Sequence, residues 1–117
     1  MLRKIDWESQ IGRRLKLRDL HVFLTVVQRG SMAKAAQQLG VSQPAVSEVI
    51  ADLEHALGVR LVDRSARGVE PTIYGCALLK RSVAAFDELK QGIRDIEFLS
   101  DQTAGEVRIA APIALVR

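Results

Sequence analysis

The sequence predicts a mainly α-helical fold in which three short helices and a two-stranded hairpin are followed by one long helix. Three observations indicate this. Apolar residues recur at helical spacing over residues 17–27, 46–57 and 78–99. A glycine follows each of the three short helical segments, where it can end a helix. Short β-prone runs at 59–63 and 68–71 precede the long helix.

The first two helices are bounded by good capping residues. Leu17, Leu20, Phe23, Leu24 and Val27 share one face of the first helix, which we expect to end at Gly30. Ser31 is a favourable N-cap for the second, alanine-rich helix at Met32–Leu39. Gly40 then permits a tight turn, after which we expect Val41 to point back into the core.

The third helix and the hairpin follow the turn. Ser42 is the expected N-cap, Pro44 lies in the first turn, and Gly58 ends the helix. The expected buried face consists of Val46, Val49, Ile50, Leu53 and Leu57. A polar turn at Arg64–Gly68 joins the two β-prone runs, and Thr72 caps a long helix that should reach about Gln102.

We expect four segments along the chain. They are an N-terminal extension at 1–15, a compact domain at 16–71, a long helix at 72–102, and the start of a further domain at 103–117. The extension has apolar residues four apart and is either a short amphipathic helix or a loose tail. Glu106–Ala111 alternates weakly as one strand would, and a lone strand is not stable by itself. We expect it to belong to a second domain that this chain lacks.

Charge and composition indicate a folded domain that suits a polyanionic partner. Hydrophobic residues make up 48% of the 117 residues, and the formal net charge is +3. Positive charges gather near the start of the chain, at Arg3, Lys4, Arg13, Arg14, Lys16 and Arg18. The stretch 87–106 is acidic instead. A nucleic-acid-binding face is therefore expected in the N-terminal half.

Cysteine usage and hydropathy exclude several classes of protein. Cys76 is the only cysteine, so neither an intrachain disulfide nor a cysteine-rich zinc site can form. No apolar run approaches the ~18 residues of a membrane span, and the N-terminus lacks an apolar signal core. We expect a cytoplasmic protein, at the nucleoid, with no membrane partner, metal or cofactor.

The segment Ser31–Leu57 has the pattern of a helix-turn-helix. Two helices joined by a short turn cross steeply, which requires small residues where their backbones meet. Ala35 and Ala36 are small, and Gly40 tolerates a positive φ in the turn. With the hairpin as a wing, this predicts a winged helix-turn-helix: three helices plus two strands, followed by a linker or dimerisation helix. The alternative is an ordinary α-hairpin.

The exposed face of the third helix is expected to read duplex DNA in the major groove. Gln43 can bind adenine bidentately, and Pro44 can pack on a thymine methyl. Ser47 can bind a base or a phosphate, and Glu48 lies beside it. Gln43 could instead be an ordinary surface residue.

Phosphate contacts are expected around this reading face. They involve the helix caps Ser31 and Ser42, together with Lys34, where backbone N–H groups and the helix dipole attract anions. Arg64 and Arg67 of the wing should reach a phosphate or the minor groove, and Thr72 completes the set. Lys34 could instead be a solvated charge, and the two arginines ordinary turn residues.

Several motifs in order and spacing resemble those of the LysR-type transcriptional regulators, between about Lys16 and Ala111. The matching stretches are Leu17–Phe23, Gly30–Ala36, Leu39–Ser47, Leu53–Leu61 and Arg64–Gly75. The resemblance implies a winged helix-turn-helix, a linker helix, and then an effector-binding region of the periplasmic-binding-protein type, whose first strand Glu106–Ala110 resembles. A small-molecule effector would act only through that missing C-terminal domain.

The sequence departs from the family pattern at three places. Glu48 stands where the family usually has Arg or Lys. A carboxylate there is repelled by phosphates but can accept a hydrogen bond from cytosine N4, or it can pair with a neighbouring arginine. Val62 stands where the family favours Phe. Residues 1–15 have no family counterpart.

The long helix carries an apolar face that is too wide for one exposed helix. Seven residues follow alternating 4-3 spacing, as in a coiled coil, from Leu78 to Leu99. A second stripe runs beside them. The expected dimer interface consists of Leu78, Leu79, Ser82, Ala85, Phe86, Leu89, Ile93 and Ile96. The alternative is that this face packs only on its own domain, as the first turns should.

We therefore predict a sequence-specific DNA-binding fragment of a transcriptional regulator. The resemblance implies an antiparallel homodimer that binds a pseudo-palindromic operator, with tetramers allowed in a full-length protein. The alternative is a protein-interaction module without specific DNA binding. An enzyme is not expected, because His21 and His55 are far apart and Cys76 has no histidine or acid arranged beside it in any recognisable motif.

Overall fold

The computed structural model describes residues 15–104, and the side chains of 15–102. Two compact units divide this chain, the first ending at Val83 and the second beginning at Ala84. The helix considered within 1–15 and the strand expected at 106–111 lie outside the described residues.

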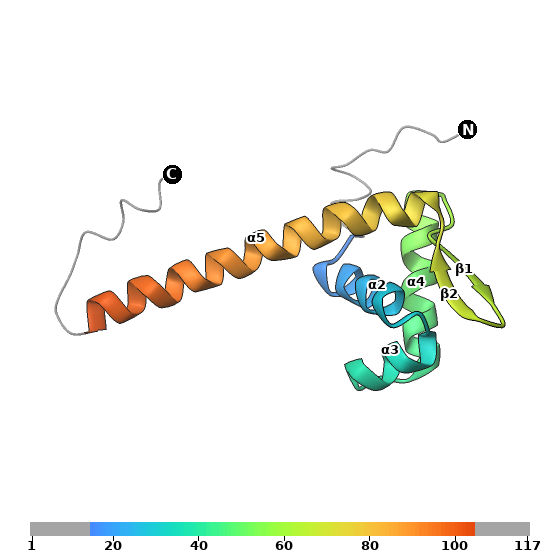
Figure 1. The fold of residues 1–117 in the computed structure, drawn as a ribbon, viewed down its shortest axis with the longest axis horizontal. Helices are drawn as coiled ribbons and strands as arrows, with labels where there is room; N and C mark the ends of the chain where they lie inside the picture. Colours follow the sequence, from blue (N-terminus) through green and yellow to red (C-terminus); the bar gives the residue numbers. More distant parts are fainter. Residues whose placement is uncertain (1–14, 105–117) are drawn as a thin grey trace. The chain divides into compact units, whose positions relative to one another are not determined.

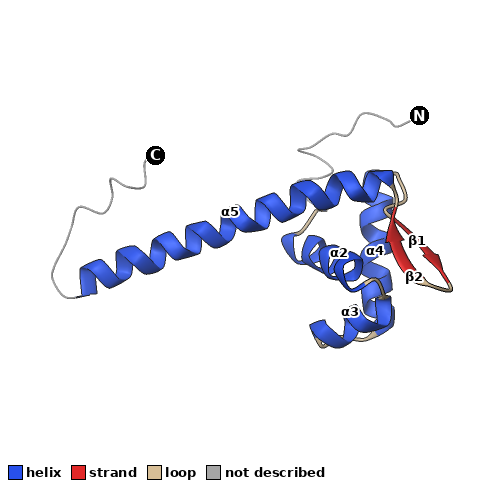
Figure 2. Cartoon of the chain, in the orientation of Figure 1, coloured by secondary structure: helices blue, strands red, loops and turns tan. Residues whose placement is uncertain are grey.

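Helices dominate the described chain, and the predicted fold class is confirmed. The elements are α2 (Leu17–Arg29), α3 (Met32–Leu39), α4 (Gln43–Leu57), β1 (Val62–Ser65), β2 (Gly68–Pro71) and α5 (Ile73–Ala104) (Figure 1). The two strands form one antiparallel hairpin beside α4 (Figure 2).

The short helices begin and end where their capping residues predict. The Ser31 Oγ accepts a hydrogen bond from the Lys34 N–H at 3.1 Å, and the Ser42 Oγ accepts one from the Ala45 N–H at 3.2 Å. Gly40, with φ of 73°, ends α3 and opens the turn into α4. These caps orient α4 and leave its N-terminal residues exposed.

The core lies between the three short helices and the hairpin. Its largest fully buried side chains are Phe23, Ile50, Leu53, Leu61, Val26 and Val46. Two expectations were wrong. Leu17 is exposed, and Val41 is 47% exposed instead of pointing into the core. Periodicity assigned Leu17 to an apolar helix face and the tight turn directed Val41 inward, but both side chains remain exposed.

The wing is shorter at its base and tighter at its tip than the sequence predicts. β1 begins at Val62, not Val59, and continues to Ser65, which pairs with Gly68. The turn therefore has only two residues, 66 and 67. The Val69 N–H donates to the Gly30 carbonyl at 3.0 Å, and a Cβ added at Gly68 would overlap that same oxygen. β2 is thus held directly against the end of α2.

The first turn of α5 is packed tightly against the root of the wing. Gly75 is buried, and a Cβ at this position would overlap the Leu61 carbonyl oxygen. Cys76 follows it with an exposed thiol. The helix continues to Ala104, two residues beyond the predicted end. Within the described chain, no helix is both long and apolar enough to cross a membrane.

Candidate nucleic-acid interface

The N-terminal half of α4 presents a polar face. Gln43, Pro44 and Glu48 are exposed and Ser47 is half-buried, while Val46 and Ile50 on the opposite side belong to the core. The apolar side anchors the helix, and the capped first turn holds the polar side chains outward. The structure therefore brings together the four residues predicted to read bases.

The start of α3 places a cation near a capped helix terminus. Lys34 is exposed, and its backbone N–H is satisfied by Ser31. Ser31 and Ser42 are both N-caps, so each hydroxyl already accepts one hydrogen bond but retains its proton for a further acceptor. This arrangement can bind an anion at a helix N-terminus.

The wing contacts α4 through a side-chain hydrogen bond that the sequence did not predict. The Arg64 Nη2 donates to the Ser47 Oγ at 3.2 Å. Arg67 is exposed in the two-residue turn, where its backbone N–H donates to the Ser65 Oγ at 3.2 Å. One wing arginine thus lies against the reading face of α4, and the other is at the tip of the hairpin.

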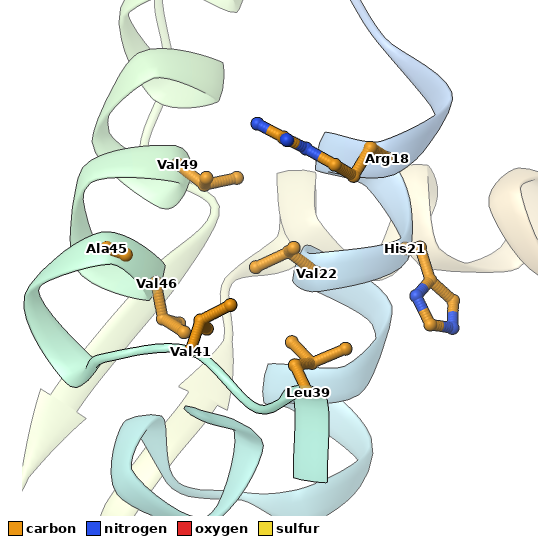
Figure 3. Close-up of a pocket in the computed structure, with 8 residues that line it drawn as sticks. All are labelled: Arg18, His21, Val22, Leu39, Val41, Ala45, Val46 and Val49. Carbon is orange, nitrogen blue, oxygen red and sulfur yellow. The ribbon is translucent and has the colours of Figure 1, made fainter. Parts of the chain in front are cut away.

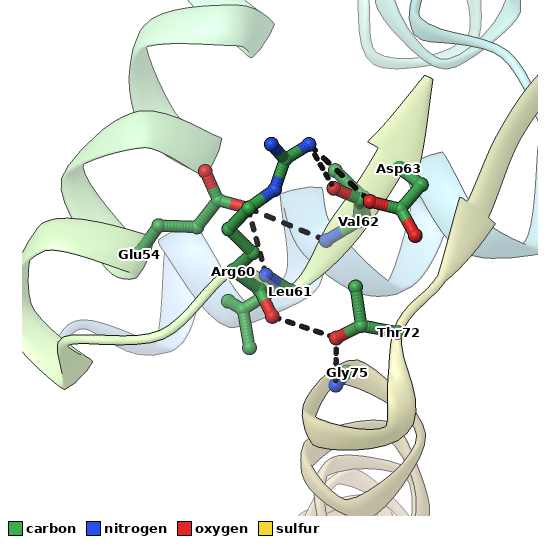
Figure 4. A network of polar contacts seen from close by, with 7 residues as sticks. All are labelled: Glu54, Arg60, Leu61, Val62, Asp63, Thr72 and Gly75. Atoms are coloured by element: carbon green, nitrogen blue, oxygen red, sulfur yellow. Dashed lines mark hydrogen bonds and ion pairs between the residues drawn. The ribbon is translucent and has the colours of Figure 1, made fainter. Parts of the chain in front are cut away.

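Thr72 forms two hydrogen bonds within the chain. Its Oγ1 donates to the Arg60 carbonyl at 2.6 Å and accepts from the Gly75 N–H at 3.1 Å (Figure 4). The prediction that Thr72 caps α5 is confirmed. Because the hydroxyl proton is donated to the Arg60 carbonyl, the structure assigns Thr72 a capping role, and its contact with DNA stays a prediction.

Glu54 is the residue that sequence reasoning missed. From the last turn of α4, its Oε2 accepts hydrogen bonds from the Leu61 N–H at 2.7 Å and the Val62 N–H at 3.3 Å (Figure 4). Nearby, the Arg60 Nη2 donates to the Val62 carbonyl at 3.2 Å and pairs with Asp63 at 3.3 Å. Glu54 lies in the matching stretch Leu53–Leu61, but the sequence assigns it no role, because its partners are backbone groups.

An open hollow of about 280 Å³ lies between α2, the turn after α3, and α4 (Figure 3). Its wall is mainly apolar and includes Val22, Val41 and Val49, with Arg18 and His21 beside it. The His21 ring points away from these valines. No group of three or more histidine, cysteine or acidic side chains among the described residues could hold a metal ion.

Part of the predicted dimer face is covered by its own chain. Leu78 and Leu79 pack partly buried against the core, and Ser82 is only 3% exposed. Ser82 is therefore too buried to contact a partner, whereas the half-buried Leu78 and Leu79 stay predicted interface residues. The expectation that the first turns of α5 pack on their own domain holds for these residues.

Further along α5, apolar side chains are exposed. Leu89, Ile93 and Ile96 are 47%, 57% and 66% exposed, and Ala85 is exposed as well. Phe86 is half-buried. We call Ala85, Phe86, Leu89, Ile93 and Ile96 the α5 stripe.

The fold and this face define a winged helix-turn-helix protein. Residues 17–82 match the family model described as "Bacterial regulatory helix-turn-helix protein, lysR family", and the chain belongs to that family. The predicted resemblance is thereby confirmed. Relatives with this domain are named as transcriptional regulators.

Curated relatives include several regulators that are more than twice as long as this chain. An uncharacterized HTH-type transcriptional regulator, YfeR of Shigella flexneri, is 42% identical over 95 residues, which are 81% of this chain and 31% of that protein. TdcA of Escherichia coli strain K12 is 40% identical over 97 residues, covering 83% and 31% respectively. The chain thus spans about a third of the length of these relatives.

Solved structures of similar chains include complexes with DNA. The BenM DNA-binding domain in complex with catB site 1 DNA aligns with a TM-score of 0.70 at 30% identity, covering 74% of this chain and 97% of that one. The CbnR DNA-binding domain in its DNA complex aligns with a TM-score of 0.67 at 34% identity, covering 74% and 99%.

Proposed function

We propose that this chain is the DNA-binding part of a bacterial transcriptional regulator and binds duplex DNA sequence-specifically. The observation that carries the proposal is the exposed polar face of α4, with Arg64 of the wing hydrogen-bonded to Ser47 within it. Similar chains have been solved with DNA bound, which supports the same function here. Acting on chromosomal DNA, the protein would work in the cytoplasm at the nucleoid.

The roles we propose divide into reading and positioning. Gln43, Pro44, Ser47 and Glu48 would contact base edges in the major groove, because they lie in the first two turns of α4. Phosphate contacts would come from the capped helix starts and the wing, namely Ser31, Lys34, Ser42, Arg64 and Arg67. The base contacts would determine sequence, and the phosphate contacts would fix the register on the duplex.

We further propose that the α5 stripe pairs two copies of the chain. An exposed row of apolar side chains at coiled-coil spacing favours burial against another helix. A homodimer would present two copies of α4 to a pseudo-palindromic operator. The relatives are longer than this chain. In a protein of their length, the additional C-terminal region would bind a small-molecule effector and would allow dimers to form tetramers.

Selection of bound duplexes from a random pool, followed by anisotropy titration of the selected sequence, tests this function. We expect a two-fold-related consensus and an affinity at least about 10³-fold above that for unrelated DNA. A chain that dimerises yet binds all duplexes equally weakly would contradict the proposal. That result would favour a protein-interaction module that uses the α5 stripe.

A further inference from the structure

Two hydrogen-bonded links join α4 to β1 in the part of the chain that the structure describes. At the root of the wing, the Glu54 carboxylate accepts from two consecutive backbone N–H groups, those of Leu61 and Val62. Further along the strand, Arg64 donates to Ser47. The root link is partly buried, whereas the Arg64 link is exposed to solvent.

The root link is the stronger of the two on physical grounds. Both links are charge-assisted, but the Glu54 carboxylate makes two partly buried hydrogen bonds, whereas the Arg64 guanidinium makes one that is exposed. Removing the carboxylate would leave two partly buried N–H groups without their acceptor. The Arg64–Ser47 bond ends on a hydroxyl that water can replace.

One backbone hydrogen bond ties the wing to α2, because the Val69 N–H donates to the Gly30 carbonyl at the end of that helix. At the root of the wing, the N–H of Thr72, the residue that caps α5, donates to the Leu61 carbonyl at 2.9 Å. These bonds hold the wing at α2 and at the start of α5. Of the two links to α4, the one through Glu54 is partly buried and consists of two hydrogen bonds, so it is the one that places the wing relative to α4.

We propose that Glu54 is the positioning residue that aligns the wing with α4, so that Arg64 and Arg67 meet DNA when the first turn of α4 enters the groove. The inference rests on the proposed DNA-binding function. Glu54 itself lies in the last turn of α4, and its Oε2 is occupied by the wing amides. It acts on DNA affinity through the wing, not by contact.

The direction of the change in DNA affinity when Glu54 is replaced distinguishes a positioning role from simple charge repulsion. A carboxylate near DNA repels phosphates, so replacing an acidic residue should by charge alone raise affinity. A positioning role requires the opposite for Glu54. Asp52 is a matched control, because it is an exposed carboxylate on the same helix two residues earlier.

The experiment compares Glu54→Ala with Asp52→Ala in the full chain, using the duplex selected by the wild type. Binding is measured by anisotropy across 50–200 mM salt. We expect Glu54→Ala to bind about tenfold more weakly and to lose one to two units of salt slope, as the wing's phosphate contacts are lost. Asp52→Ala should bind as well as the wild type or better.

The salt slope distinguishes the loss of DNA contacts from a simple decrease in the fraction of folded protein. A smaller folded fraction lowers the apparent affinity but leaves the slope unchanged, because the folded molecules release the same counterions. Glu54→Gln is the second variant; it keeps an uncharged acceptor and should recover part of both affinity and slope. Circular dichroism confirms that each variant is helical.

The last measurement repeats the Glu54 substitution in a chain whose wing arginines have been removed. In a chain already carrying Arg64→Ala and Arg67→Ala, adding Glu54→Ala should cause no further loss of affinity. An equal loss in both backgrounds, or an unchanged salt slope, overturns the positioning role while leaving DNA binding intact. A wild type without preference for any duplex overturns the proposed function, and this inference with it.

Discussion

Gln43 is the first residue of α4, and its side chain is exposed there with the amide free to face a base edge. We predict that Gln43→Ala costs about 1–3 kcal/mol of binding free energy at one base pair of each half-site and relaxes selectivity at that position. Anisotropy titrations against single-base variants of the selected duplex measure this. An equal loss on every variant would assign Gln43 to the phosphates instead.

Glu48 is exposed on the same face and carries a negative charge toward the proposed DNA surface. We predict that Glu48→Gln strengthens binding to unrelated DNA severalfold, because one repulsion from the phosphates is removed. The ratio of specific to unrelated affinity should fall at the same time. Competition titrations with bulk DNA report both quantities, and weaker binding to unrelated DNA would contradict the expectation.

Among elements, the junction between β1 and α5 depends on a glycine for steric reasons. Alanine normally stabilises a helix interior over glycine by about 1 kcal/mol. At Gly75 the added methyl would overlap the Leu61 carbonyl, so we predict that Gly75→Ala lowers the free energy of unfolding by about 1–3 kcal/mol. Thermal or urea unfolding followed by circular dichroism measures the change.

Gly92, in the same helix, is the matched control. Nothing lies within 4 Å of the Cβ that alanine would add there, so Gly92→Ala should raise helix stability by about 0.5–1 kcal/mol. If Gly75→Ala lowers stability while Gly92→Ala raises it, the loss at Gly75 is due to its close packing against Leu61. A gain at both positions would mean that the wing root shifts to accept a methyl group.

The elements show which features of the fold the sequence could predict. Helix ends were predictable at Ser31, Gly40 and Ser42, because capping depends on residues within one turn. The exposure of Leu17 and the burial of Ser82 were not, because periodicity defines a helix face without showing what covers it.

The candidate site also has features that could be predicted from the sequence and features that could not. The exposed residues of α4 follow from helical geometry once the buried face is known. The roles of Glu54 and Thr72 depend on backbone groups of Arg60, Leu61 and Val62, which no side-chain pattern encodes. Hydrogen bonds from a side chain to distant main-chain groups are therefore the feature of the site that could not be predicted from the sequence.

For the whole molecule, the α5 stripe is expected to determine the oligomeric state. We predict that Ile93→Lys converts a dimer into monomers, because a charge placed on that stripe would be buried without a partner. Sedimentation velocity measures the change, and binding to a two-half-site duplex should weaken more than binding to a single half-site.

The control for this prediction is Gln91→Lys, which adds the same charge to the polar side of the helix. Gln91 there donates to the Asp95 Oδ1 at 3.3 Å and accepts from the Arg94 Nη1 at 3.4 Å. This variant should remain dimeric. Dissociation of both variants would point to net charge as the cause, and dissociation of neither would place the dimer contact elsewhere.

The exposed thiol of Cys76 makes the protein convenient to observe directly. The sequence has one cysteine, and it lies in the first turn of α5, one residue after the buried Gly75. A thiol-reactive probe would therefore attach once per chain, close to the wing root and without prior mutagenesis. In a homodimer there would be two such probes, and the distance between two spin labels could be measured as DNA is added.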